Sequence, residues 1–493
     1  MEQIWTASEL KQADADTMQM GLASPVLMER AALAVMDVIL AENLDMTETV
    51  VLCGTGNNGG DGIAVARLIA EKGYHPTVLT AGDPSRYSEE RKHQEEILRY
   101  YDAEILPADH AADWEHKTLI VDALFGIGLS RPVREEYEDL IRRINESHLP
   151  VVSVDIPSGI HTDTGAVLGC AVKASHTVSF SGIKAGLLLY PGRLYAGKLH
   201  VRKIGIRMPA KAVKDQYLQA SEMDLSQLPE RDEAGNKGTF GKVLVIAGSR
   251  TICGAAILAG KACLRSGAGM VRIYTEETNR VPVAASFPEA LIDTYHEDNW
   301  SEESLKTALA WADAVLIGPG IGTGETAGRI LDHVLTHCTL PLVMDADALN
   351  LLCGNSERIR DYPGNCIITP HVMEMSRLSG LSCEEIKKDP KKAAKDMAEK
   401  SGACVILKDA VTLIAVPEGP VCLYADGGSE LATAGSGDVL AGIVVSLTAQ
   451  DPARILCNAV LAVCLHGYSG KKAAENLSKA AVTAGDLIGH LAF

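Results

Sequence analysis

Short apolar runs rich in β-branched residues alternate with helical stretches along most of this chain. In the first half such runs occur at residues 50–53, 76–79, 118–122 and 150–155. Runs of this length separated by helices form β-α-β units around a parallel sheet. A second alternation begins at Gly241 and continues through residue 407. The sequence therefore predicts two α/β domains.

Length and composition agree with two separate cores. The chain has 493 residues, of which 47% are hydrophobic and only 4% aromatic. One core seldom organises so long a chain, and such interiors are built from aliphatic side chains in layers. Residues 208–237 are polar, charged and weakly periodic, which is typical of a linker. We predict a first domain at residues 1–210, a linker at 211–237 and a larger domain at 238–493.

Charge and cysteine usage limit the partners and the compartment. The net charge of −18 argues against nucleic acid or an anionic membrane as the main partner. The 12 cysteines include no CxxC pair, so we expect a reducing, cytoplasmic environment. We expect no secretory signal, because the first residues lack its basic and apolar regions, and no membrane-spanning helix, which needs roughly 18 to 20 apolar residues. A homo-oligomer is also expected.

A glycine-rich loop at residues 54–62 follows the first apolar run and opens a helix. A strand, glycine loop and helix in this order let backbone N–H groups bind phosphate. The loop departs from the dinucleotide-binding fingerprint because Asn57, Asn58 and Asp61 stand among its glycines, where they offer oxygens and amides to a ligand or a cation. A structural turn held by Asx hydrogen bonds is the alternative.

Two aspartates, Asp122 and Asp155, each end an apolar run in the first domain. Open α/β sheets bind ligands at this edge. Oxygen atoms of Asn58, Asp122 and Ser158 could together ligate a hard monovalent or divalent cation. One such carboxylate would be an ordinary loop cap, whereas two at corresponding strand ends favour a functional site.

The segment 433–442 places Asp438 at the start of an apolar helix, after closely spaced glycines. A helix start carries free N–H groups and a partial positive charge, so an anionic group can bind there. An acid at this position fits a base that acts on a substrate hydroxyl while the N–H groups hold a transferring phosphoryl group. The alternative is that Asp438 only caps its helix.

Other predicted strand ends in the second domain also carry polar or glycine-rich segments, at residues 318–322, 345–350, 369–371 and 408–412. Parallel strands bring such segments to one sheet edge. His371 alone would be an ordinary loop histidine. In this set we expect it to contact a ligand.

The first-domain segments 54–62, 122–126, 154–159 and 180–186 resemble the NAD(P)H-hydrate epimerase domain. The resemblance implies a Rossmann-like fold, catalysis by Asp155 and a potassium ion bound by Asn58, Asp122 and Ser158. Ile127 stands where that family more often has threonine. The substrate contacts that it implies are Asn57, Asn58, Gly59, Gly60, Asp61, Gly126, Ile127, Gly128, Leu129, Ser130, Arg131, Pro132 and Asp155.

The second-domain segments 237–249, 318–322, 345–350 and 435–438 are similar to the ribokinase-like superfamily, and more closely to ADP-dependent NAD(P)H-hydrate dehydratases. Val372 and Met373 replace the usual Pro-Gly after the histidine. The implied hydrate contacts are Gly267, Gly320, His371 and Asp438. The implied nucleotide contacts are Lys408, Asp409, Ala410, Val411, Thr412 and Gly437.

Together the resemblances cover nearly the whole chain and imply a bifunctional isomerase and lyase. The first domain would interconvert the R and S hydrates of NADH and NADPH. The second would dehydrate the S form with ADP, giving AMP and phosphate, with Mg²⁺ accompanying the nucleotide. A ribokinase-like, ATP-dependent small-molecule kinase fused to a Rossmann-like binding domain remains the alternative, as does a non-catalytic first domain.

Overall fold

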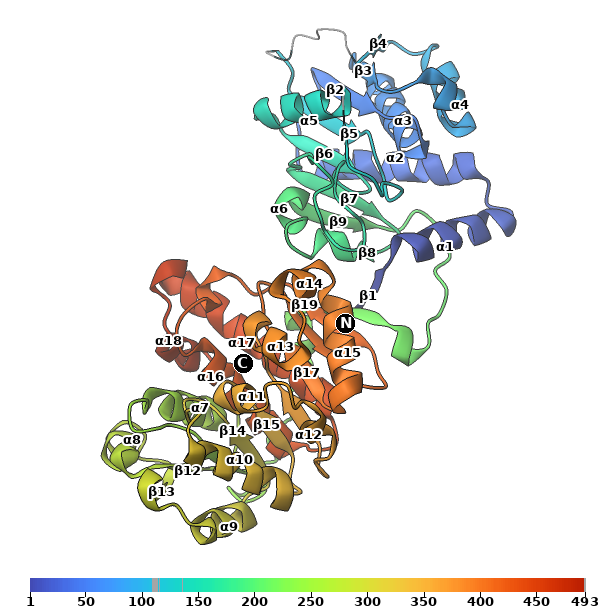
Figure 1. The fold of residues 1–493 in the computed structure, drawn as a ribbon. Coiled ribbons are helices and arrows are strands. Elements are labelled where there is room, and N and C mark those ends of the chain that lie inside the picture. Colours follow the sequence, from blue (N-terminus) through green and yellow to red (C-terminus); the bar gives the residue numbers. More distant parts are fainter. Residues whose placement is uncertain (109–113, 115, 135, 492–493) are drawn as a thin grey trace. The chain divides into compact units, whose positions relative to one another are not determined.

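The computed structural model describes residues 1–108, 114, 116–134 and 136–491. The chain divides into two compact units (Figure 1). The N-terminal unit is Gln3–Lys211, and the C-terminal unit is Ala212–Phe493 together with Met1–Glu2. Each unit is a sheet with helices on both faces, which confirms the predicted α/β fold.

The N-terminal unit contains a seven-stranded parallel sheet of order β4-β3-β2-β5-β6-β7-β9. The chain winds outward from β2 in one direction and from β5 in the other, so the order reverses between these two strands. Ligands bind beyond the carboxyl ends of strands at such a reversal. The strands are β2 (Thr49–Cys53), β3 (Thr77–Thr80), β4 (Glu104–Pro107), β5 (Leu119–Ala123), β6 (Val151–Val154), β7 (His176–Phe180) and β9 (Lys198–Arg202).

Alternate residues of the central strands feed two cores, one on each face of the sheet. Val51 and Cys53 pack with helices α2 and α3, whereas Val50 and Leu52 pack with α5. The helices of this unit are α1 (Ala7–Gln19), α2 (Ser24–Ala41), α3 (Asn57–Glu71), α4 (Glu89–Leu98), α5 (Glu136–Glu146) and α6 (Arg193–Ala196).

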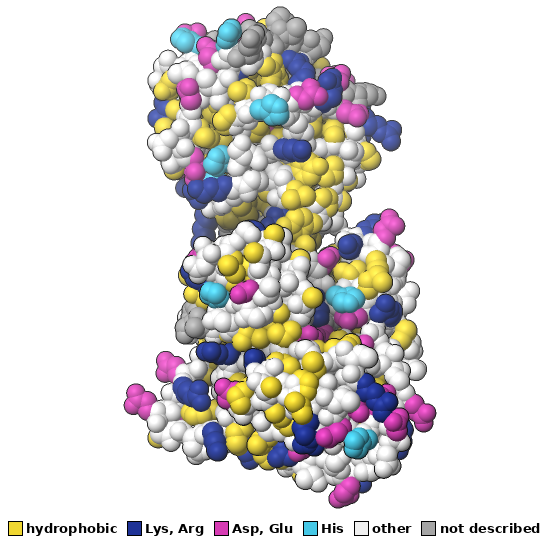
Figure 2. All heavy atoms as spheres, turned by 90° about the vertical axis from the view of Figure 1, so that its left-hand side faces the viewer, with side chains coloured by type: hydrophobic (Ala, Val, Ile, Leu, Met, Phe, Trp, Pro, Cys, Tyr) yellow, Lys and Arg dark blue, Asp and Glu magenta, His cyan; other side chains and the backbone are white. Residues whose placement is uncertain are grey.

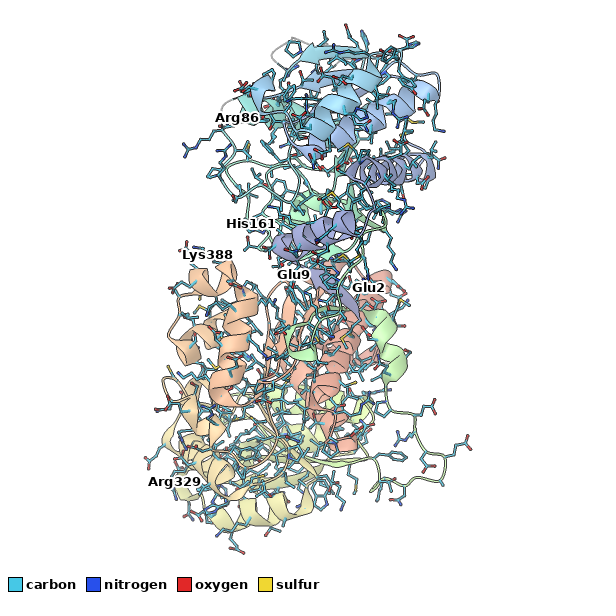
Figure 3. The ribbon with its side chains drawn as sticks, turned by 90° about the vertical axis from the view of Figure 1, so that its right-hand side faces the viewer. Glu2, Glu9, Arg86, His161, Arg329 and Lys388 are labelled. Atoms are coloured by element: carbon cyan, nitrogen blue, oxygen red, sulfur yellow. The ribbon has the colours of Figure 1, made fainter. Side chains whose placement is uncertain are left out.

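The start of the chain is tied to the rest of the N-terminal unit. Strands β1 (Glu2–Trp5) and β8 (Ile183–Lys184) pair in parallel. Thr6 and Glu9 then form a capping box that begins α1. Glu9, labelled in Figure 3, also forms an ion pair of 2.7 Å with Lys211.

The C-terminal unit is built on strands in the order β13-β12-β11-β14-β15-β16-β17-β18-β19-β10. Strands β13 to β17 are parallel, β18 is antiparallel to both its neighbours, and β10 is parallel to β19. The strands are β10 (Tyr217–Ala220), β11 (Lys242–Ile246), β12 (Met270–Glu276), β13 (Leu291–Tyr295), β14 (Ala314–Ile317), β15 (Leu342–Met344), β16 (Cys366–Ile368), β17 (Cys404–Leu407), β18 (Thr412–Ala415) and β19 (Val421–Tyr424).

Helices α7, α16, α17 and α18 contribute to the core on one face of this sheet. Helix α16 lies so close to α7 that a Cβ atom on Gly442 would be 2.3 Å from the Ala259 carbonyl oxygen. Arg329 of α10, labelled in Figure 3, lies 5.0 Å from the centroid of the Trp300 ring. The helices are α7 (Gly254–Arg265), α8 (Arg280–Ser286), α9 (Glu302–Trp311), α10 (Glu325–His337), α11 (Asp347–Leu351), α12 (Glu357–Arg360), α13 (Val372–Ser379), α14 (Cys383–Lys388), α15 (Pro390–Ser401), α16 (Ser436–Gln450), α17 (Ile455–Asn476) and α18 (Ala484–Gly489).

The segment expected to be a linker takes part in the C-terminal sheet and core. Strand β10 lies inside it and pairs with β19 along its length. Tyr217, Ala220 and Leu225 are buried. The polar composition concealed this strand, because only its first and last side chains are fully buried.

The surface carries no large region of one charge on the face drawn in Figure 2, where acidic and basic side chains are interspersed over each unit. All 12 cysteines are free thiols. Within the described ranges, no helix has the length and apolar character needed to cross a membrane.

Candidate active sites

A cavity of about 710 Å³ opens in the N-terminal unit, beside the segments that follow β2, β5 and β6. Most of the expected epimerase contacts line it, and they come from the first turns of α3, from the loop after β5 and from the end of β6. These lining residues are Asn57, Asn58, Asp61, Gly126, Ile127, Gly128, Leu129, Ser130, Arg131 and Asp155.

Gly59, Gly60 and Pro132 are not among the lining residues of this cavity. A Cβ atom on Gly59 would lie 2.2 Å from the Gly54 carbonyl oxygen, and one on Gly60 would lie 2.7 Å from the Met28 methyl carbon. These glycines therefore allow the first turn of α3 to pack against the loop and against α2. Pro132 is exposed.

Asp155 follows β6 and holds a left-handed backbone conformation, with φ of 70°. This region is unfavourable for residues other than glycine, although aspartate tolerates it better than most. The fully buried Lys184 ammonium donates to Asp155 Oδ1 at 2.7 Å and to Ser179 Oγ at 2.7 Å. The Phe180 N–H also donates to Asp155 Oδ1, at 3.2 Å. The carboxylate is thus fixed at the wall of the cavity.

Two further carboxyl groups, of Asp14 and Asp61, line the same cavity. Burial raises the pKa of Asp61 well above its ordinary value, and the negative charges of Asp155 and Asp14 raise it further. Burial also raises the pKa of Asp14, and Asp155 again adds to the effect. Carboxyl groups with raised pKa values hold their proton more readily and are candidates for general acids.

Lys184 and Asp14 were not among the predicted site residues. Lys184 is a lone lysine in an apolar stretch, a signal that sequence reasoning could have used. Asp14 gave no local signal, because it lies on the amphipathic helix α1 and reaches the cavity only through the tertiary fold.

Asp122 is buried at the end of β5, where serines surround its carboxylate. It accepts hydrogen bonds from Ser153 Oγ at 2.7 Å, from Ser158 Oγ at 2.6 Å and from Ser158 N–H at 2.9 Å. Burial raises the pKa of Asp122, and the hydrogen bonds from Ser158 and Ser153 oppose that effect. A buried carboxylate of this kind gains from a nearby cation.

Asn58 lies next to the loop that contacts Ser158. A Cβ atom on Gly126 would be 3.0 Å from Asn58 Oδ1, and the preceding Phe125 N–H donates to Ser158 Oγ at 2.9 Å. Asn58 Nδ2 is buried with no hydrogen-bond partner among the described residues. Asn58, Asp122 and Ser158 offer oxygen donors and one buried negative charge, which fits a hard cation such as potassium.

In the C-terminal unit, acidic and basic groups converge at the carboxyl ends of β15 and β17. Lys408 Nζ donates to the buried Asp345 Oδ1 at 2.8 Å. A Cβ atom on Gly437 would lie 3.4 Å from Lys408 Nζ and 3.9 Å from Asp345 Oδ2. The N-terminus of α16 therefore lies within van der Waals distance of this ion pair.

Asp438 lies in the first turn of α16 with an unusual pKa. Burial raises the pKa of Asp438 to about 6; the negative charges of Asp345 and Asp347 add to the effect and Lys408 opposes it. The helix begins after Gly435, and no side-chain hydrogen bond caps it in the described structure. Asp438 therefore does not act as the cap, and the first N–H groups of α16 remain able to bind an anion.

His371 is the N-cap of α13, a role that sequence reasoning did not foresee. Its Nδ1 atom accepts from the N–H groups of Met373 at 3.1 Å and Glu374 at 3.2 Å. The His371 backbone also forms a parallel bridge with Lys408. The replacement of Pro-Gly by Val372 and Met373 is thus accommodated as the first turn of a capped helix.

The Lys408 ammonium interacts with several carboxylates at this edge. Burial alone would lower its pKa, but the negative charges of Asp345, Glu374 and Asp438 outweigh burial and raise it. Burial raises the pKa of Glu374, and Lys408 opposes that shift. The lysine therefore remains a cation among acids, next to an anion-binding helix start.

The glycine loop after β14 borders the same edge. Gly320 has φ of 62°, and a Cβ atom there would lie 2.7 Å from Ile252 Cγ2 and 3.1 Å from Ala255 Cβ. The Gly322 N–H donates to Asp347 Oδ2 at 2.9 Å. The loop therefore packs against the start of α7, a contact that the sequence did not indicate.

The remaining expected nucleotide contacts directly follow Lys408: Asp409, Ala410 and Val411 connect β17 to β18, and Thr412 begins β18. Asp409 and Ala410 are exposed, Thr412 is half-buried and Val411 is buried. The connection leaves the sheet at the edge that holds Lys408.

Gly267 does not join this group of residues. It precedes β12 and therefore lies at the opposite edge of the sheet. It lines a separate cavity of about 580 Å³ together with Gln450, the last residue of α16. At ~1.5 Å per helical residue, Gln450 is about 18 Å along α16 from Asp438. The expected hydrate contact at Gly267 is therefore incompatible with a site at Asp438.

Comparisons with known proteins cover both units. The family model described as NAD(P)H-hydrate dehydratase matches residues 243–492, and the model described as YjeF-related protein N-terminus matches residues 24–186. A bifunctional NAD(P)H-hydrate repair enzyme from Escherichia coli is 35% identical over 99% of this chain and 93% of its own length.

Solved structures match the C-terminal part. A ribokinase-like superfamily protein from Enterococcus faecalis is 31% identical, with a TM-score of 0.50, over 56% of this chain and 94% of its own. An ADP/ATP-dependent NAD(P)H-hydrate dehydratase from Bacillus subtilis, co-crystallised with ATP and Mg²⁺, is 32% identical over 57% of this chain and 97% of its own, with a TM-score of 0.49. By its full-length identity and both domain matches, the chain belongs to the family of bifunctional NAD(P)H-hydrate repair enzymes.

Proposed function

We propose that this chain repairs hydrated NADH and NADPH by epimerising their R and S forms and then dehydrating the S form at the expense of ADP. The observation that carries the proposal is the position of Asp438, which lies at an uncapped helix start beside the Lys408–Asp345 pair. A base, an anion-binding backbone and a cation at one point are the parts that phosphoryl transfer to a hydroxyl requires.

In the N-terminal cavity, inversion of the hydrated carbon requires the hydroxyl group to leave one face of the ring and water to return on the other. One group donates a proton and another accepts one. Asp61, whose pKa is raised by burial, suits the donor. We assign the acceptor role to the Asp155 carboxylate, which pairs with the Lys184 ammonium. Potassium held by Asn58, Asp122 and Ser158 would supply positive charge beside the buried Asp122.

In the C-terminal unit, the difficulty is that hydroxide is a poor leaving group. Asp438 accepts the proton of the hydrate hydroxyl while the hydroxyl oxygen attacks the β-phosphorus of ADP. AMP leaves. Phosphate then departs with the electron pair of its C–O bond, the neighbouring ring carbon loses a proton to water, and the ring double bond forms again. The N–H groups of residues 435–437 and the Lys408 ammonium stabilise the charge on the transferring group.

Magnesium would neutralise the phosphates of the nucleotide at this edge. Asp345, Asp347 and Glu374 carry the carboxylate oxygens that Mg²⁺ prefers, directly or through water. The four residues after Lys408 are our proposed nucleotide contacts, and Gly320 and His371 are our proposed hydrate contacts.

The test is to incubate the protein with NADH hydrate and either ADP or ATP while recording the absorbance of NADH. We expect NADH to return with release of AMP and phosphate when ADP is supplied. A stable phosphorylated product, with no NADH formed, would instead support a small-molecule kinase.

A further inference from the structure

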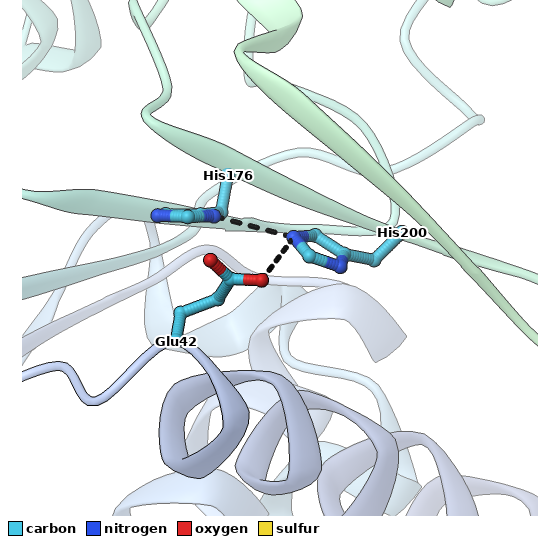
Figure 4. A group of neighbouring side chains, drawn as sticks. All are labelled: Glu42, His176 and His200. Carbon is cyan, nitrogen blue, oxygen red and sulfur yellow. Dashed lines mark hydrogen bonds and ion pairs between the residues drawn. The ribbon is translucent and has the colours of Figure 1, made fainter.

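Two imidazoles and a carboxylate meet in the N-terminal unit, away from the cavity (Figure 4). His176 begins β7, His200 lies on β9, and Glu42 directly follows α2. His200 is the register partner of Val178, so both imidazoles lie on one face of the strand pair. Potential ligand atoms of the three residues lie within 4.8 Å of one another.

The spacing of the ring nitrogens matches a tetrahedral metal site. His176 Nδ1 and His200 Nε2 are 3.2 Å apart, and His200 Nε2 is 3.8 Å from Glu42 Oε1. Zinc binds imidazole nitrogen at about 2.0 to 2.1 Å, which places two tetrahedral nitrogen ligands roughly 3.3 Å apart. The nitrogen pair therefore already has the separation of two ligands on one ion.

The environment favours the protonation states that a metal requires. Burial lowers the pKa of His200 and of His176. The pKa of Glu42 is also lowered, first by its hydrogen bond from Lys198. Neutral histidine and ionised glutamate are the ligating forms. The last turn of α2 contains no basic residue, so a cation at Glu42 would also complement the helix dipole.

We propose that Glu42, His176 and His200 bind one Zn²⁺ ion, with water completing the tetrahedron. Two imidazole nitrogens and one carboxylate oxygen are a poor match for Mg²⁺, Ca²⁺ or K⁺ but suit zinc. The ion joins the C-terminal end of α2 to β9, the edge strand of the sheet. Met28 of α2 lines the N-terminal cavity about 20 Å along the helix from Ala41, so the ion takes no part in the chemistry of that cavity.

Lys198 and Arg202 are the positive groups that oppose this site. Lys198 Nζ donates to Glu42 Oε1 at 2.7 Å, but its side chain is 62% exposed and can turn into solvent. An exposed ion pair of this kind contributes little free energy, so its competition weakens metal binding only modestly. Lys198→Met should therefore tighten Zn²⁺ binding by up to about fivefold.

The test uses the full-length protein, stripped of metal and titrated with Zn²⁺ under reducing conditions. We expect Glu42→Gln and His200→Ala each to bind one zinc ion fewer per chain than the unaltered protein. His75→Ala, an exposed histidine paired with Asp102, serves as the matched control and should lose none. Thiol binding, for example at the exposed Cys353, is common to all variants and cancels in the comparison.

Thermal unfolding gives an independent measurement. Zn²⁺ should raise the Tm of the unaltered protein and of Lys198→Met, and by less in Glu42→Gln, a change at a solvent-accessible position that does not endanger folding. Equal zinc stoichiometry in all variants, or the same Tm increase in Glu42→Gln, would overturn the proposal.

Discussion

Lys408 Nζ lies 2.8 Å from Asp345 Oδ1, and the Asp345 side chain is only 2% exposed. Removing one partner of such a pair leaves an uncompensated buried charge, which typically costs about 3 to 5 kcal/mol. Two acids, Asp438 and Glu374, also face this lysine. The pair thus sets both the local stability and the acidity of the proposed base.

Lys408→Met should therefore lower the free energy of unfolding of the C-terminal unit and raise the pKa of Asp438, because Lys408 is the group that opposes its upward shift. Dehydration should fall, and its acidic limb should move to higher pH. Denaturant unfolding and a pH–rate profile would measure the two effects. An unchanged acidic limb would contradict the electrostatic coupling.

Asp438→Asn keeps the size of the side chain but removes its ability to accept a proton. We expect dehydration to fall by roughly 10² to 10⁴-fold at saturating ADP. Epimerisation should not change, because its residues belong to the N-terminal unit, and Tm should not fall, because α16 does not use the Asp438 side chain as a cap. Near-normal turnover would rule out Asp438 as the base.

The pH dependence follows from the raised pKa of Asp438. A base must be ionised to act, so kcat/KM for dehydration should decline as the pH falls below about 6. The free energy of unfolding depends on pH in the opposite sense, because the folded state holds the Asp438 proton more tightly than the unfolded state. The stabilisation from this proton is complete below pH 3.8 and is lost as the pH rises through about 6. Rate and unfolding measurements across this range check both signs.

Replacing potassium by a bulky organic cation should slow epimerisation alone, because Asn58, Asp122 and Ser158 all belong to the N-terminal unit. Dehydration of pure S hydrate is the internal control. Equal slowing of both reactions would contradict the cation assignment.

A truncated chain that begins at Ala212 should be more stable than one that begins at Leu228. The shorter fragment loses β10 and the buried Leu225, and loss of one buried leucine typically costs about 2 to 5 kcal/mol. Urea unfolding of the two fragments measures the difference. Equal stability would mean that residues 212–227 act as a simple linker.

The sequence indicated both sheets because most of their strands are short apolar runs between helices. It also indicated Asp122 and Asp155, since each stands where such a run ends. The resemblance implied a hydrate contact at Gly267, but this glycine precedes β12, and only segments that follow a parallel strand lie at the ligand edge. It missed Asp14 and β10 for a different reason: the other residues that line the cavity of Asp14, and the strand β19 that pairs with β10, are distant in sequence.

The left-handed backbone at Asp155 limits which substitutions can test the role of its carboxylate. Alanine there would remove the carboxylate and also impose backbone strain, so lost activity would have two causes. Asparagine is the near-isosteric neutral residue that tolerates this conformation. Asp155→Asn therefore separates the chemical role of the carboxylate from its conformational role. β-Branched replacements should strain the backbone and destabilise the fold, with or without substrate.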